Sequence, residues 1–149
     1  MPEIELNDLL RDEYRLLYAQ APLRPERAFE VDAAVARITA PEAWACYQGV
    51  EAALGVPAHV VVIIHSLESG ARFDRHLHIG DPLTARTVQV PKGRPKSGEP
   101  PFTWEDSATD ALRLRKLDRW KDWSAEGIGV FTRSGRRIAS VNLGFAGFG

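Results

Sequence analysis

The chain has 149 residues, of which 44% are hydrophobic and 26% charged, a composition typical of one globular domain. No apolar run approaches the roughly 18 residues of a transmembrane helix, and the acidic N-terminus lacks the features of a secretory signal. The single cysteine, Cys46, excludes an intrachain disulfide and a cysteine-based zinc site. The net charge of −1 divides unevenly: residues 1–60 carry five basic and ten acidic side chains, and residues 61–149 carry 14 basic and ten acidic ones. The second half is compatible with an anionic partner or with solvated surfaces, but it contains no nucleic-acid-binding motif.

The first half contains signals for three amphipathic helices. Asn7 is the predicted N-cap of a helix over 8–20, Pro25 suits the first turn of a helix over 25–39, and Pro41 begins a helix that ends before Gly55. The apolar positions expected to face the core are, for the first helix, Leu9, Leu10, Tyr14, Leu16 and Leu17; for the second, Ala28, Val31, Val35 and Ile38; and for the third, Trp44, Tyr47, Val50 and Leu54.

Residues 57–69 (PAHVVVIIHSLES) contain the most apolar stretch of the chain. The run of β-branched residues from Val60 to Ile64 favours a buried strand. The length of the segment, Pro57 at its start and Gly70 after its end favour a helix. The residues alone leave the two alternatives evenly balanced, and a helix apolar on all sides would have to be central.

The region after Gly70 contains little helical signal before Thr103. Alternation over 84–90 predicts a short strand, and the Pro- and Gly-rich segment that follows predicts a basic loop that is either functional or a surface excursion. Thr103 and Asp106 resemble a capping box for a helix that extends to about Asp118. The basic loop carries Lys92, Arg94 and Lys96, and the inward positions of the helix are Ala108, Ala111, Leu112 and Leu117. Trp120 and Trp123 are expected in the core, with a helix staple or a carbohydrate-stacking surface as the alternatives.

A dense polar cluster follows the apolar segment 57–69. If that segment is a helix, Glu68 lies near its C-terminal end, where apolar surroundings and the negative end of the helix dipole both disfavour a charged carboxylate. A carboxylic acid that stays protonated is what general-acid cleavage of a glycosidic bond requires. The alternative is that Glu68 serves as a cap or pairs with Arg72, four residues later. The cluster consists of His65, Glu68, Ser69, Asp74, His76, His78 and Asp81.

Four motifs together resemble a small bacterial and phage family of the lysozyme-like superfamily, which includes lytic transglycosylases and goose-type lysozymes. They are IHSLES (64–69), HLHIGDPL (76–83), TARTVQVPKGRP (84–95) and PPFTWEDSA (100–108), and the resemblance covers roughly residues 10–124. It implies a single, mainly α (α+β) lysozyme-like domain with a small β-region after the catalytic helix. Residues 57–69 would then be that helix, and 84–90 would belong to the β-region.

The resemblance also implies cleavage of peptidoglycan glycan strands, by a muramidase or a lytic transglycosylase, with Glu68 as the general acid and with no cofactor or metal. Asp81 is the first candidate for a second carboxylate, before Asp106 and Asp74, although many members of the superfamily use one Glu. The remaining supporting residues are Ser69, His65, His76 and His78. The expected partner is the glycan strand, with no nucleic acid and no membrane insertion.

The C-terminal segment departs from that family, which ends in a helix closing with an Asn-Gly-x-Gly-Tyr motif. Residues 125–149 contain six of the 12 glycines and have no helical period. A shift of the reading frame after about Ser124, or a degenerate, disordered tail, would explain the difference. Because no export signal is visible, we expect cytoplasmic synthesis with holin-type release, as for a phage endolysin, or another non-classical route.

Two other functions remain open from the sequence. One is a zinc-dependent cell-wall peptidase, because His65 and Glu68 lie three residues apart and His76 and His78 alternate, although the spacing matches no strong zinc motif. The other is a non-catalytic module of lysozyme-like fold that binds glycan or takes part in the assembly of a larger particle.

Overall fold

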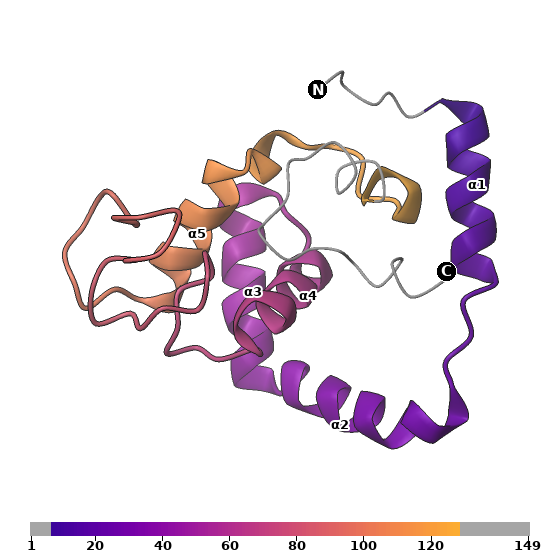
Figure 1. Ribbon diagram of the computed structural model, residues 1–149, viewed down its shortest axis with the longest axis horizontal. Helices are drawn as coiled ribbons and strands as arrows, with labels where there is room; N and C mark the ends of the chain where they lie inside the picture. Colours follow the sequence, from indigo (N-terminus) through magenta and orange to yellow (C-terminus); the bar gives the residue numbers. More distant parts are fainter. Residues whose placement is uncertain (1–6, 129–149) are drawn as a thin grey trace.

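The protein is mainly helical, as the sequence predicts, in a computed structural model that describes residues 7–128 (Figure 1). The elements in chain order are α1 (Asp8–Ala19), the 3-10 helix η1 (Pro25–Arg27), α2 (Ala28–Ile38), α3 (Pro41–Leu54), α4 (Ala58–Ser69), α5 (Trp104–Leu114) and the 3-10 helix η2 (Leu117–Arg119). Residues 125–128 are also helical. The rest of the segment 125–149 lies outside the described residues, so the two explanations of its composition stay open.

The apolar segment forms the helix α4 over Ala58–Ser69 and not a strand. Its first free amide, Ala58 N, donates to the Glu51 carboxylate at 3.1 Å, and Gly70 ends it in the left-handed conformation at φ 61°. Because α4 packs against α3 and joins the common core, all of its β-branched side chains except Ile63, which is 42% exposed, are buried without a sheet. The buried residues of α4 are Ala58, Val60, Val61, Val62, Ile64 and His65.

The core lies where α3, α4 and α5 meet (Figure 1). Tyr47 and Val50 of α3 are buried as expected, and Trp44 and Leu54 pack at the edge of the core. The inward positions expected for the helix after Thr103 are all buried, and Trp120 and Trp123 are partly buried against the core. That helix ends at Leu114, earlier than expected. Lys116 then adopts a left-handed conformation at φ 61°, and the chain continues as the short η2.

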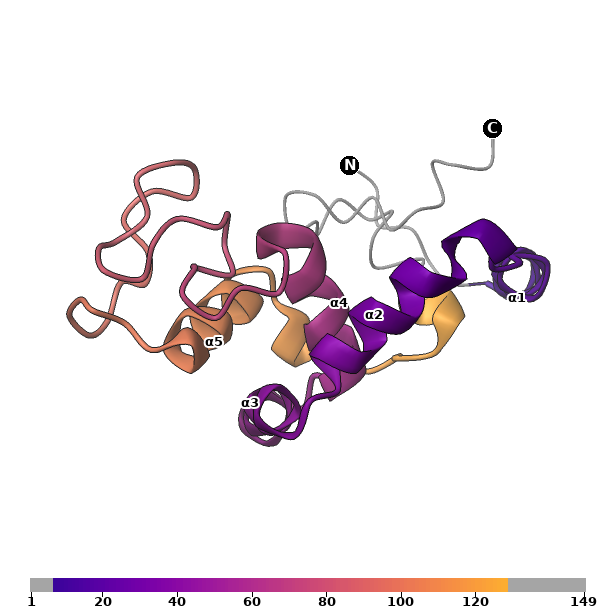
Figure 2. The same cartoon turned by 90° about the horizontal axis from the view of Figure 1, so that it is seen from below.

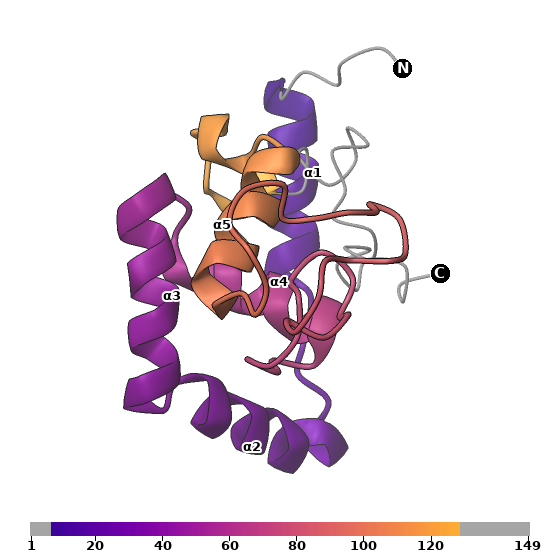
Figure 3. The same ribbon diagram turned by 90° about the vertical axis from the view of Figure 1, so that its left-hand side faces the viewer.

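The first two helices contribute less to the core than their patterns predict. Tyr14 is the buried residue of α1, and α2 has none. Leu9 and Leu16 are 82% and 57% exposed, and Val35 of α2 is 46% exposed. The expected inward faces of α1 and α2 are therefore largely open. The reason is tertiary. α2 runs sideways from the start of α3, and Ile38 at its last position is the α2 side chain that packs against the core (Figure 3). α1 lies at the opposite end of the molecule from α5 (Figure 2).

The small β-region expected after α4 is absent from the described residues. Between α4 and α5 there is one isolated antiparallel bridge, Arg75 to Pro82, and residues 84–90 form no strand. The alternation over 84–90 does not correspond to burial, because Val88 and Val90 are 70% and 86% exposed. Backbone amides in this stretch are bound by side chains and by the loop itself, so they are not available for a sheet ladder.

No single helix among the described residues is long and apolar enough to cross a membrane. By length and composition, α3 and α4 pass that test as a pair, but they are bent by 116° at the break between them.

Candidate functional site

Glu68 lies on the last turn of α4, half-buried, where the apolar core meets the polar segment that follows. A tight turn over 76–81 packs against this end of the helix. His76 N donates to Asp81 O at 2.7 Å, and Gly80 N donates to His76 O at 2.8 Å. Gly80 has φ +79°, and a Cβ at this position would lie 3.3 Å from the Glu68 carbonyl oxygen. The structure therefore brings Glu68 and the HLHIGD motif together, and a glycine allows the close approach.

Asp81 is directed into the loop that follows it. Its Oδ2 accepts from Val88 N at 2.9 Å and from Gln89 N at 3.5 Å, and its Oδ1 accepts from the Gln89 side-chain amide at 3.2 Å. The residue is 9% exposed. N–H donors from Val88 and Gln89 thus occupy both carboxylate oxygens. The Asp81 side chain therefore satisfies backbone amides of the loop that a neighbouring strand would satisfy in a sheet.

His65, which the resemblance gives as a supporting residue of the site, lies in the core. Its ring is fully buried against Phe73 and Trp104. Nδ1 is 2.8 Å from the Tyr47 hydroxyl, and Nε2 is 3.0 Å from the Arg72 carbonyl oxygen. Burial lowers the pKa of His65, so the neutral ring is favoured. This histidine joins the end of α4 to α3 and to the chain that follows Gly70.

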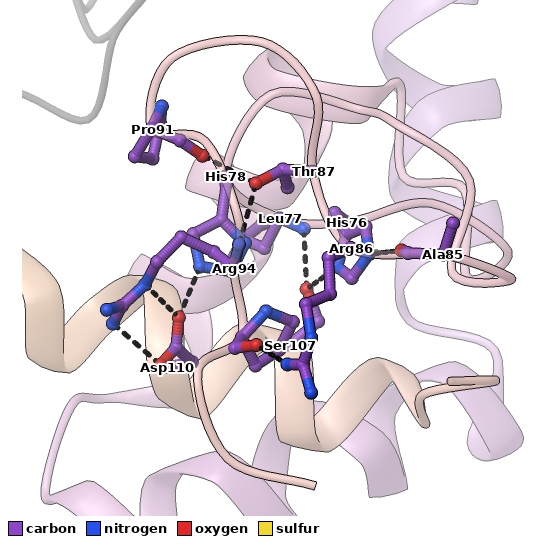
Figure 4. Close-up of polar contacts among 11 residues, drawn as sticks. His76, Leu77, His78, Ala85, Arg86, Thr87, Pro91, Arg94, Ser107 and Asp110 are labelled. Atoms are coloured by element: carbon purple, nitrogen blue, oxygen red, sulfur yellow. Dashed lines mark hydrogen bonds and ion pairs between the residues drawn. The ribbon is translucent and has the colours of Figure 1, made fainter. Parts of the chain in front are cut away.

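His76 is also fully buried and fixed at both ring nitrogens (Figure 4). Nε2 is 2.7 Å from the Ala85 carbonyl oxygen, so it carries the proton and donates. Nδ1 then accepts from the Ser107 hydroxyl at 2.9 Å, and the Ser107 oxygen accepts in turn from Leu77 N at 3.1 Å. This network attaches the segment after α4 to α5, across 31 residues of sequence.

His78, Arg94 and Asp110 form a second link between the loop and α5 (Figure 4). Arg94 binds Asp110 through two bonds, Nε to Oδ2 at 2.8 Å and Nη2 to Oδ1 at 2.7 Å. His78 Nε2 lies 2.6 Å from the same Oδ2. Burial lowers the pKa of His78, although Asp110 acts in the opposite direction. The ring is therefore favoured in its neutral form, with Nε2–H donating to the carboxylate.

The long loop between α4 and α5 is also held by hydrogen bonds within itself. Thr87 is 2% exposed, and its backbone N donates to Arg94 O at 2.9 Å while its hydroxyl accepts from Arg94 N at 2.9 Å. Arg86 donates to the carbonyl oxygens of Pro95 and Gly98, and its guanidinium lies 5.2 Å from the centre of the Phe102 ring. The predicted basic loop thus uses Arg94 internally, while Lys92 and Lys96 are exposed.

The remaining residues predicted for the site form short-range contacts. The Ser69 hydroxyl donates back to His65 O at 3.3 Å. Asp74 is exposed and pairs with Arg72 through two bonds, and this guanidinium lowers its pKa. Asp106 lies in the first turn of α5, where its backbone N donates to the Thr103 hydroxyl at 3.1 Å, as the capping box predicts.

A polar hollow of about 240 Å³ lies between α5 and the loop over 95–98, and sequence reasoning did not identify it. Its lining residues are Pro95, Ser97, Gly98, Asp106, Thr109, Asp110 and Arg113. The α5 members are spaced at 106, 109, 110 and 113, which is one face of a helix. That spacing was visible in the sequence, but the loop that forms the opposite wall was not.

Among residues 7–128, no group of three or more His, Cys, Asp or Glu side chains is placed to hold a metal ion. His65 and His76 already use both ring nitrogens in hydrogen bonds to other protein groups. The histidines and Glu68 whose spacing suggested a zinc peptidase therefore do not come together as a set of metal ligands in this part of the chain.

Comparison of the chain with protein-family models, with curated proteins and with solved structures gave no match.

Proposed function

We propose that the protein is a lysozyme-like domain that cleaves peptidoglycan glycan strands, with Glu68 as the general acid. The observation that carries the proposal is the position of Glu68, half-buried on the last turn of the buried helix α4 and against the fixed 76–81 turn. The backbone of this acid is fixed at the junction of an apolar helix end and a rigid polar loop, which favours a defined position for a proton donor. The four family-like motifs also form one connected unit, since they supply α4, the loop and the start of α5.

The proposed reaction uses Glu68 to donate its proton to the glycosidic oxygen, and the bond from that oxygen to the anomeric carbon breaks. The positive charge that develops on the sugar is then captured by water, as in a muramidase, or by the sugar's own 6-hydroxyl, as in a lytic transglycosylase. The attacking oxygen forms the new bond to the anomeric carbon and gives up its proton to the Glu68 carboxylate, which restores the acid. Asp81 supports this reaction as a positioning residue, because N–H donors occupy both of its oxygens and it holds the loop beside Glu68. The proposal therefore assigns one carboxylate to the chemistry.

The test is digestion of purified cell walls by the full chain, by Glu68→Gln and by the matched variant Glu13→Gln, which lies on an exposed position of α1. We expect wild type and Glu13→Gln to release muropeptides and Glu68→Gln to release about 100-fold less or none, the usual contribution of a general acid. Mass spectrometry of the products separates anhydro ends, from a transglycosylase, from reducing ends, from a hydrolase.

Equal release by Glu68→Gln would overturn the assignment of the acid. Binding of glycan by the wild type without any product would overturn catalysis, and it would favour a non-catalytic glycan-binding module. Circular dichroism of each variant distinguishes loss of the acid from loss of the fold.

A further inference from the structure

The hollow between α5 and the 95–98 loop has a fixed floor. Asp110 is held there by the two bonds from Arg94 and the one from His78, and its side chain is 16% exposed. The Arg94 charge compensates the Asp110 charge, so the floor offers a carboxylate acceptor with little net charge. A carboxylate fixed from behind by three donors is already in place before a ligand arrives.

The opposite wall is fixed by contacts that lie outside the hollow. Arg86 holds the loop through the carbonyl oxygens of Pro95 and Gly98, the latter at 2.6 Å, and does not itself line the hollow. Gly98 has φ +76°, a conformation that few other residues adopt, and it faces the Phe102 ring. Ser97 on the loop and Thr109 on α5 therefore line a cavity whose two walls are both anchored.

The two ends of the hollow carry opposite charges that the described structure leaves uncompensated. Asp106 lies at the N-terminal end of the α5 face and Arg113 at the C-terminal end. Within residues 7–128, neither side chain takes part in an ion pair. Seven residues of helix separate them by about 10 Å along the axis.

These features favour a ligand with separated charges. None of the residues that line the hollow is aromatic, so it offers no ring for stacking on the face of a sugar. At about 240 Å³ it is smaller than the roughly 300–1,000 Å³ of pockets for drug-sized ligands. An extended peptide advances about 3.3–3.6 Å per residue, so three small residues span the distance between the two charges.

We propose that this hollow binds the free ends of a short peptide of small residues, with its ammonium group at Asp106 and its carboxylate at Arg113. Between the two ends, the Asp110 carboxylate accepts from peptide N–H groups. The hydroxyls of Ser97 and Thr109 donate to peptide carbonyl oxygens. This inference stands independently of glycan cleavage by Glu68, because none of these residues takes part in that reaction.

The experiment is a titration of the isotope-labelled full chain with trialanine, followed by the backbone amide signals of Ser97, Gly98 and Thr109. N-acetyl-trialanine amide, which lacks both end charges, and N-acetylglucosamine serve as comparison ligands. We expect trialanine to shift these signals in a saturable way and the blocked peptide to bind at least tenfold more weakly. Asp106→Asn and Arg113→Gln should each weaken trialanine binding about fivefold, the upper value for an exposed ion pair.

The exposed residues Asp32 and Arg119 provide matched controls, since Asp32→Asn and Arg119→Gln make the same chemical changes outside the hollow. Both controls should bind trialanine like the wild type. Equal binding of the blocked peptide, binding of N-acetylglucosamine in place of trialanine, or the absence of any saturable shift would each overturn the proposal. Because the titration contains no glycan strand, its failure is separate from failure of the cell-wall digestion.

Discussion

The role of Asp81 gives the sharpest test of the loop structure, because the sequence indicated a second catalytic carboxylate and the geometry indicates an anchor. Asp81→Ala removes the acceptor for Val88 N at 2.9 Å and for the Gln89 side-chain amide at 3.2 Å, at a residue that is 9% exposed. Hydrogen bonds to a charged group contribute about 1.5–3 kcal/mol each, and two that share one carboxylate are not additive. We therefore expect a loss of about 2–3 kcal/mol in the free energy of unfolding.

The assay is urea unfolding followed by circular dichroism. With a slope of about 2 kcal/mol per M, the expected loss lowers the midpoint by about 1 M. Hydrogen exchange should also show lost protection at the amide of Val88. Asp81→Asn keeps an acceptor oxygen for that amide, so it should recover most of the stability. The exposed Asp32 provides the control, and Asp32→Ala should leave the midpoint unchanged.

Activity on cell walls separates the anchor from a catalytic group. If Asp81 positions the loop, Asp81→Asn retains most of the muropeptide release and Asp81→Ala loses it together with stability. The reasoning is refuted if Asp81→Ala unfolds at the wild-type midpoint, or if Asp81→Asn is fully stable but as inactive as Glu68→Gln.

Two further predictions concern the packing of the loop and the buried histidines. Gly80→Ala should destabilise the protein by about 1–2 kcal/mol, because a residue with φ +79° would place its Cβ 3.3 Å from a carbonyl of α4. Gly49→Ala, at a helical position with nothing within 4 Å of the added Cβ, should instead stabilise by about 0.5–1 kcal/mol, and equal urea midpoints for the two variants would contradict this reasoning. Stability should also fall as the pH drops below about 6.5, because burial lowers the pKa of His65 and His78 in the folded chain and the unfolded chain takes up protons first. Urea midpoints at pH 7.5 and 5.5 check the sign, and a higher midpoint at pH 5.5 would show that the buried rings are not held neutral.

The sequence by itself determined the helices that depend on local signals. Asn7 and Thr103 cap α1 and α5 as their side chains predict, and Pro41 and Gly55 bound α3. These features act over three or four residues, so they can be recognised in a single chain. The α3 and α5 core positions also follow from periodicity, because each helix buries one face and α3 packs against both α4 and α5.

The tertiary structure alone decided which amphipathic helix faces are buried and which partners the polar side chains bind. The alternation over 84–90 resembled a strand, but Asp81 binds the amides that a neighbouring strand would have paired. The partners of His76 and His78 are 31 and 32 residues away on α5, a separation at which sequence spacing carries no information about contact. Likewise, α1 and α2 have amphipathic patterns, yet Leu9 remains exposed because no described element packs over it. Local chemistry fixes an element, and only the packing of distant elements fixes what its side chains touch.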